Sequence, residues 1–329
     1  MSGTVREGCD RLDAGGRVGS TAMADMDVRV EDLGHDLHLI DAGMHGEEER
    51  LACYLFDTPQ RVLIETGPSV TLHHLTAALD HLGIDDLAAI VVTHIHLDHA
   101  GGAGHLAARY PGAKIGVHRA GAPHLVDPER LWASATRIYG EEGMRRLWGP
   151  MEPIAADRLL VLDEGDRIPL GGHRHLDVMY TPGHARHHLV FLDPETGGCF
   201  VGDAVGIAFP HGHVVQPVTP PPDLDPDLVV AQLHRMAARD PAFLGFAHFG
   251  LEPDPQRALA EAETRLRAWV EFVRGLPDDD ETAWQELRRW VLDGYRADGC
   301  PEEMIAVYDD NTFWPMQVAG IRRWLAQRG

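Results

Sequence analysis

Positive charge, and lysine in particular, is scarce in this sequence. The chain has 329 residues with 29 Lys+Arg against 51 Asp+Glu, so its formal net charge is −22. Lys114 is its single lysine, and no local basic patch interrupts the acidic surplus. A surface of this charge repels phosphate backbones. We therefore expect no nucleic-acid partner, and we expect neutral or weakly charged substrates rather than polyanions.

Cysteine and long apolar runs are also scarce. The 4 cysteines lie far apart and form no CxxC pair, which excludes a zinc finger or a thioredoxin-like motif and suits reduced thiols in a cytoplasmic protein. No apolar run approaches the roughly 18 residues of a membrane-spanning helix, so we expect no membrane partner. Residues 1–26 are polar and rich in glycine, and we expect them to form a disordered leader.

Short strands and helices alternate from about residue 28. The apolar spacing within 72–82 predicts a helix, whereas residues 119–158 break the rhythm and are predicted to form a lid-like insertion. From residue 254 onward the pattern is helical, and five tryptophans after residue 268 are expected to pack these helices against the rest of the protein. The order of elements predicts a mixed α/β layered protein. Further segments with the pattern of strands are 37–40, 53–56, 62–64, 88–92, 114–117, 177–180, 188–192, 199–201 and 243–247.

Histidine, in contrast, is abundant, with 21 residues, and imidazole is the commonest transition-metal ligand. Directly after the apolar run 88–92, four side chains that can bind metal follow one another closely: His94, His96, Asp98 and His99. His94 and His96 are two residues apart, so in an extended segment they project to the same side. Burying such rings without partners is costly. The cluster therefore indicates a metal site rather than a structural role.

This HxHxDH segment is followed by three more motifs in a fixed order. They are Thr-Pro-Gly-His ending at His184, Gly-Asp at Asp203 and Ala-His-Phe-Gly at His248. The set resembles the metallo-β-lactamase superfamily, in its glyoxalase II-like and lactonase-like hydrolase branch. The resemblance covers about residues 28–250. It implies an α/β fold, a four-layer αββα sandwich over residues 27–253, with a C-terminal helical extension over residues 254–329.

The resemblance also implies two metal ions and their ligands. A first ion is bound by His94, His96 and His184, a second by Asp98, His99 and His248, and Asp203 bridges the two. Imidazole and carboxylate together favour zinc, iron or manganese over calcium or magnesium, and zinc is the most frequent in the superfamily. Two such ions lower the pKa of a bridging water and give a hydroxide nucleophile near neutral pH. Asp98 is expected to orient that nucleophile as well as to bind metal.

Further residues are expected to support the ligands or to contact substrate. Many relatives have Asp-Thr-Gly where this chain has Glu65-Thr66-Gly67, so Glu65 is expected to support a ligand histidine with a re-aimed, longer side chain. His188, four residues after His184, is expected to orient a ligand or a strand. Candidates for substrate contact are Tyr139, Trp132 and Tyr180, with core packing as the alternative for each.

Several other histidines have positions near these motifs. His211 and His213 are two residues apart and could form a pair of metal ligands. Their place in a loop after Asp203 instead favours the rim of a substrate site. His45 and His118 are also candidates for that rim. His187 is expected to be exposed.

The predicted function is a dinuclear metal-dependent hydrolase of a small acyl substrate, a thioester, lactone or ester. A mononuclear iron persulfide dioxygenase-like oxidoreductase is the main alternative, because such enzymes resemble the same motif set; metal content and oxygen consumption would separate the two. A non-catalytic metal-binding scaffold is a third reading, and the complete ligand set argues against it. No basic cluster suits the carboxylates of glutathione. The expected partner is a small molecule, and a homodimer is compatible with the sequence.

Overall fold

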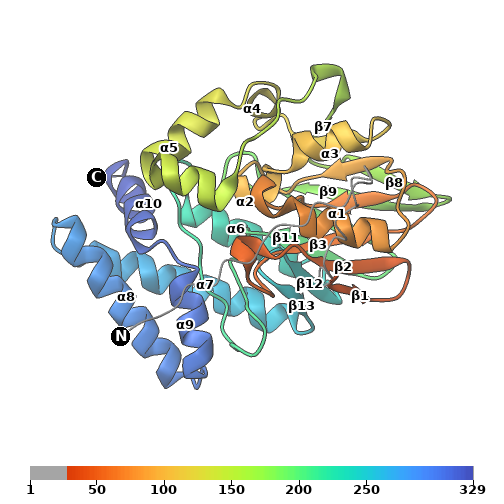
Figure 1. Cartoon of the computed structure of the whole chain (residues 1–329). Coiled ribbons are helices and arrows are strands. Elements are labelled where there is room, and N and C mark those ends of the chain that lie inside the picture. The colour runs from red at the N-terminus through yellow and green to blue at the C-terminus, as the bar shows by residue number, and fades with distance from the viewer. Residues whose placement is uncertain (1–27, 329) are drawn as a thin grey trace, which may run out of the picture.

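The computed structural model describes residues 28–328, and the leader predicted for residues 1–26 lies outside this range. Within it, two β-sheets lie face to face and helices cover both outer faces (Figure 1). The predicted four-layer α/β sandwich with C-terminal helices is thus confirmed. None of the helices between residues 28 and 328 combines the length and the hydropathy that crossing a bilayer requires.

The first sheet has seven strands that follow one another in chain order within the described residues. They are β1 (Val30–Asp32), β2 (Leu37–Asp41), β3 (Ala52–Phe56), β4 (Val62–Ile64), β5 (Ala89–Val91), β6 (Lys114–His118) and β7 (Leu159–Leu162). β3 and β4 form an antiparallel hairpin, as expected from the segment Asp57-Thr58-Pro59-Gln60 between them. The pairs from β4 to β7 are parallel, so helical crossovers connect them.

The second sheet has six strands in the described part of the chain, in the order β13-β12-β11-β10-β9-β8. They are β8 (Arg167–Gly171), β9 (Arg174–Tyr180), β10 (Leu189–Asp193), β11 (Gly198–Gly202), β12 (Phe243–Phe246) and β13 (Gly250–Glu252). β10 is antiparallel to both of its neighbours, whereas β12 is parallel to β11. The strands β9, β11 and β12 therefore end at the same edge of this sheet.

The helices lie between the strands and after the last of them. They are α1 (Leu72–His81), α2 (Leu97–Ala100), α3 (Ala103–Arg109), α4 (Ala122–Val126), α5 (Glu129–Gly143), α6 (Pro226–Ala237), α7 (Pro255–Arg274), α8 (Asp280–Ala297), α9 (Glu302–Asp310) and α10 (Trp314–Ala326). The predicted insertion 119–158 contains α4, α5 and a π-helical turn over Met144–Trp148.

Alternating side chains of each strand divide between two apolar layers. In β3, Cys53 and Leu55 face the helices α1 and α3, while Tyr54 and Phe56 pack in the layer between the sheets. In β10, Phe191 joins that middle layer and Val190 packs toward α6 and α7. This period of two is the geometry of a pleated strand, and burial of each large apolar side chain contributes roughly 1.5–3 kcal/mol.

Three strands differ from the sequence-based expectation. The edge strands β7 and β8 lie in a stretch where we predict no strand, and β13 lies just before the helical region. β8 contains Pro169, which lowers strand propensity but is tolerated at a sheet edge because no neighbour needs its missing N–H. A Gly/Ala-rich helix is expected from about 101 to 109, and the structure has α3 there, with the separate short helix α2 directly before it. Asp98 and His99 therefore lie on the short helix α2.

Candidate metal centre

The motif residues come together because they follow strands that end side by side. His94 follows β5 and Glu65 follows β4, two parallel neighbours in the first sheet. In the second sheet, His184 lies beyond the end of β9, Asp203 directly after β11 and His248 just beyond β12. The ends of both sheets thus place side chains that are up to 154 residues apart in sequence (His94 to His248) around one point.

Four side chains form a first group of ligand atoms. His94, His96, His184 and Asp203 each offer one atom, and all of these atoms lie within 4.8 Å of one another. His96 Nδ1 is 2.8 Å from His94 Nε2 and 3.1 Å from His184 Nε2. Three ring nitrogens that converge so closely can share one cation at their centre.

Three side chains form a second group directly beside the first. Asp98, His99 and His248 offer ligand atoms within 4.8 Å of one another, and His248 Nε2 lies 3.4 Å from Asp98 Oδ2. Asp203 faces both groups with different oxygens. Its Oδ2 is 3.5 Å from His184 Nε2, and its Oδ1 is 3.3 Å from His99 Nε2. One carboxylate between two groups is the arrangement in which a side chain can bridge two ions.

Hydrogen bonds to backbone oxygens orient two of the ligand histidines, so that the ring nitrogen on the opposite side points toward the centre of the site. The outer Nδ1 atoms of His184 and His248 lie 3.3 Å and 2.7 Å from the backbone oxygens of Val218 and Arg50. A carbonyl only accepts, so each Nδ1 carries the proton and donates, and the inner Nε2 keeps its lone pair for a metal ion. The same contacts fix the orientation of each ring.

Glu65 and His188 take positions behind the ligands. Glu65 Oε1 lies 3.1 Å from His99 Nδ1 and accepts a hydrogen bond from the Thr93 hydroxyl, so its longer side chain does reach a ligand histidine. The His188 ring stacks on the His94 ring with centroids 4.9 Å apart. His188 Nε2 accepts the backbone N–H of Asp203 at 3.2 Å.

Burial and neighbouring charges shift the histidine pKa values of the two groups in opposite directions. Burial lowers the pKa of His94 far below its usual range and lowers the pKa of His96 to about 4, so these rings are neutral and their lone pairs are available. Burial acts in the same direction on His99, but Asp203, Glu65 and Asp98 outweigh it and raise its pKa. The second group therefore favours positive charge at its centre.

Two unpartnered atoms at this centre fit a metal ion. His99 Nε2 and Asp203 Oδ1 are both buried and lie 3.3 Å from each other, but the geometry makes no hydrogen bond, and neither has another partner among the described residues. Leaving such atoms without a partner in the interior costs about 1–3 kcal/mol each, and a bound cation would satisfy both. A donor set of five imidazoles and two carboxylates suits zinc, iron or manganese.

Two neighbouring cavities share these carboxylates in their lining. They have volumes of about 440 and 160 Å³, and Asp98, Asp203 and Tyr139 line both. The structure does not bring the other two candidates for substrate contact to either cavity. Trp132 packs beside the buried Met144 and Trp148. The Tyr180 hydroxyl donates to the backbone oxygen of Arg186.

The other histidines near the motifs divide between this site and its surroundings. His45 lines the larger cavity with its ring 5.4 Å from that of Trp148. His118 instead stacks on Tyr180 with ring centroids 4.3 Å apart. The expectation that His187 is exposed is wrong: its side chain is 7% exposed, and its Nδ1 accepts the backbone N–H of Ile95 at 3.4 Å.

Residues after 310 also line the larger cavity, and the sequence motifs do not identify them. Asn311, Thr312, Phe313 and Met316 reach it from the end of α9 and the start of α10. They lie more than 60 residues beyond His248, the last motif residue. The helical pattern predicts which face of α10 is buried, but it does not tell a face that packs in a core from one that lines a cavity.

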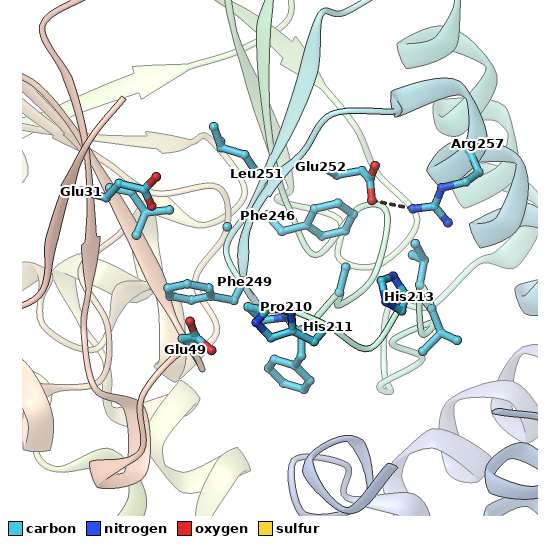
Figure 2. Close-up of a pocket in the computed structure, with 16 residues that line it drawn as sticks. Glu31, Glu49, Pro210, His211, His213, Phe246, Phe249, Leu251, Glu252 and Arg257 are labelled. Carbon is cyan, nitrogen blue, oxygen red and sulfur yellow. Dashed lines mark hydrogen bonds and ion pairs between the residues drawn. The ribbon is translucent and has the colours of Figure 1, made fainter. Parts of the chain in front are cut away.

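His211 and His213 belong to a different cavity of about 430 Å³ (Figure 2). Glu31 and Glu49 line it on the side of the first sheet, and Phe249 lies beside Glu49 in this view. Neither histidine belongs to the two groups of ligand atoms found in residues 28–328. They do not line the cavities at Asp98 either, so the structure places them away from a rim at the metal groups.

Comparison with known proteins agrees with the metal-binding groups described above. The family model described as the Metallo-beta-lactamase superfamily matches residues 34–248. The chain is similar to the metallo-beta-lactamase fold-containing protein ST1585 of Sulfurisphaera tokodaii, with 32% identity over 250 residues, 73% of this chain and 90% of the relative. The crystal structure of ST1585 matches with a TM-score of 0.58 at 30% identity and covers 71% of this chain and 86% of that one.

Shorter matches involve named enzymes. The acyl-coenzyme A thioesterase MBLAC2 of Gallus gallus is 35% identical over 137 residues, 40% of this chain and 46% of the relative. A hydroxyacylglutathione hydrolase of a Synechococcus species is 28% identical over 153 residues, 46% of this chain and 48% of the relative. Each match spans less than half of either protein. The family match, the similarity to ST1585 and the fold together show that the chain belongs to the metallo-beta-lactamase superfamily.

Proposed function

We propose that this protein is a dinuclear metal-dependent hydrolase that acts on a small acyl substrate, a thioester, lactone or ester. The observation that carries the proposal is the position of Asp203, whose two carboxylate oxygens face two separate groups of ligand atoms. A centre for a single ion would need only one of these groups. The thioesterase and the hydroxyacylglutathione hydrolase among the relatives support acyl compounds as the substrate class.

The seven side chains would hold the ions, and the chain around them would prepare the reaction. When bound, two divalent ions supply a water of lowered pKa and a Lewis acid for a carbonyl oxygen; zinc is the first candidate, with iron or manganese as alternatives. Asp98 is the more exposed of the two carboxylates, with 21% of its side chain accessible against 5% for Asp203. Its carboxylate therefore faces the substrate and can orient the attacking water by accepting its proton in a hydrogen bond.

Asp98 keeps its charge at neutral pH. Burial raises its pKa, but the neighbouring His99 and the hydrogen bond with His248 outweigh burial and lower the pKa below its usual range. An ionised carboxylate is an acceptor only, which fits the proposed orienting role. The same negative charge, together with that of Asp203, would stabilise bound cations.

The test combines metal analysis with a substrate panel. Purified protein is analysed for metal per chain and then assayed with S-lactoylglutathione, homoserine lactones, aryl esters and acyl thioesters. Two ions per chain and hydrolysis of at least one acyl class are the expected results. One iron per chain with oxygen uptake in the presence of glutathione persulfide would contradict the proposal and favour a persulfide dioxygenase-like oxidoreductase.

A further inference from the structure

The two cavities at the metal groups start from the same carboxylates and then diverge. Asp98 and Asp203 line both, and Tyr139 and Met316 line both as well. The Tyr139 hydroxyl points to Met316 Sδ at 4.0 Å. This contact joins α5, in the insertion, to α10, near the C-terminus, and the two helices lie side by side in Figure 1.

Aromatic neighbours hold Tyr139 in its contact with Met316. The Tyr139 ring has the Trp148 ring at 5.2 Å in an edge-to-face arrangement and the Phe313 ring at 5.8 Å. Aromatic pairs at such distances contribute about 0.5–1.5 kcal/mol each beyond their buried area. Tyr139 is therefore fixed by contacts from both the insertion and the C-terminal helices.

The smaller cavity, here called the narrow arm, has a mainly apolar lining away from the metal groups. Beyond the shared residues and the ligands His96 and His184, it is lined by Leu97, Leu131, Ser134, Ala135 and the three prolines 220–222. Its volume of about 160 Å³ corresponds to about five water-sized groups at roughly 30 Å³ each. A short, unbranched hydrocarbon chain fits this space and chemistry.

The larger cavity, here called the wide arm, has a mixed lining, in which apolar side chains such as Ile207 and Phe209 lie beside polar ones. Gln216, Asn311, Thr312 and Gln317 contribute amide and hydroxyl groups. Outside the metal groups, the oppositely charged Arg146 and Asp310 also line it. No cluster of cations is present among its lining residues, so this arm suits a hydrogen-bonding group of low net charge rather than a polyphosphate.

We infer that Tyr139 and Met316 sort the two halves of an acyl substrate, with the acyl chain in the narrow arm and the thiol or alcohol leaving group in the wide arm. The inference rests on the proposed function. Hydrolysis breaks the bond between the carbonyl carbon and the leaving sulfur or oxygen; water adds OH to the acyl carbon and a proton to the leaving group. The scissile carbonyl has to lie at Asp98 and Asp203, so the two fragments extend from there into different arms. The substrate class is a thioester or ester with an acyl chain of about four to six carbons.

The experiment compares two leucine substitutions on the same helix. Ala135→Leu fills the narrow arm, whereas Ala133→Leu adds the same atoms at an exposed position of α5 that lines neither arm. The zinc-loaded proteins are assayed with N-acetylcysteamine thioesters of acetate, butyrate, hexanoate and octanoate. In the wild type, kcat/KM should rise about fourfold per methylene until the arm is full, since each buried methylene is worth about 0.8 kcal/mol.

Ala135→Leu should lower kcat/KM for the hexanoyl thioester at least tenfold and change the acetyl thioester less than twofold, while Ala133→Leu should change neither. Arg146→Met should lower kcat/KM for mercaptopropionate thioesters relative to N-acetylcysteamine thioesters by the same factor at every acyl length. A loss in Ala135→Leu that is equal for acetyl and hexanoyl, or no loss at all, would overturn the inference.

A binding measurement separates this inference from the proposed function. If the metal-loaded wild type hydrolyses none of the thioesters, the proposed function fails, and calorimetry with acetate and hexanoate then tests the arms. Hexanoate should bind the wild type and Ala133→Leu more tightly than acetate, and Ala135→Leu should remove that difference. Equal binding of the two acids by the wild type, or a difference that persists in Ala135→Leu, would overturn the inference.

Discussion

The carboxylate of Glu65 offers a direct test of how this site is built. Its side chain is 1% exposed, and Oε1 lies 3.1 Å from His99 Nδ1. Glu65→Gln keeps the shape but removes the charge. A hydrogen bond to a charged group is worth about 1.5–3 kcal/mol and one between neutral groups about 0.5–1.5 kcal/mol. The loss of about 1–1.5 kcal/mol corresponds to roughly tenfold weaker metal binding at the group that contains His99.

The assay is competition for zinc against a chromophoric chelator, which yields a dissociation constant for each ion. We expect the weaker binding at the group of Asp98, His99 and His248, with the other group changed much less. Glu303→Gln, an exposed position on α9, removes the same charge far from the ligands and is the control. Thermal unfolding of the metal-free proteins separates a loss of affinity from a loss of fold. Wild-type affinity for both ions in Glu65→Gln would refute the assigned role of this carboxylate.

Three further substitutions test other parts of the structure. Asp203→Ala should abolish hydrolysis and strip metal, and two ions per chain by elemental analysis would show that this carboxylate does not bridge. Tyr54→Phe removes a buried hydroxyl that donates to the backbone oxygen of Phe246 at 2.8 Å, and urea unfolding should show a loss of about 1 kcal/mol. Gln317→Ala removes the acceptor of the buried Thr219 N–H at 2.6 Å and should cost about 1–3 kcal/mol; unchanged stability in urea would contradict the importance of this contact.

The metal groups could be predicted because their signal is local. His94, His96, Asp98 and His99 lie close together in sequence, between the end of strand β5 and the end of the short helix α2, and the remaining ligands each follow a buried strand. Strands of this kind have clear apolar runs. Which of their ends meet, and which side chains lie behind the ligands, is implied by the resemblance to the superfamily, and the contacts of Glu65 and His188 agree with it.

The substrate cavity could not be predicted in the same way. Tyr139, Trp132 and Tyr180 are all aromatic residues near the motifs, yet of these three only Tyr139 lines the two cavities at Asp98. Which aromatic side chain faces the cavity depends on how α5 packs against α10, and no pattern within either helix encodes that contact. Met316 is apolar at a helical spacing, which is equally typical of a core position.

The C-terminal helices contribute more to the site than apolar packing. The five tryptophans after residue 268 line neither arm of the cavity, and Trp269 and Trp314 pack together in a separate core. Apolar burial is non-directional and would allow these helices to slide. Buried hydrogen bonds remove that freedom, since the Tyr295 hydroxyl donates to Gln216 at 3.0 Å and Gln216 donates to Thr312 at 2.7 Å.

The loop that follows Gln216 also contacts the metal centre. Gln317 accepts three hydrogen bonds from Thr219, two of them at its side-chain oxygen. The preceding residue, Val218, presents the backbone oxygen that lies 3.3 Å from His184 Nδ1. A fixed loop fixes the tautomer and the orientation of that ligand. The segment 310–317 therefore lines the wide arm and, through Gln317, holds a ligand histidine in place. A change in this segment that alters substrate preference should also alter metal affinity.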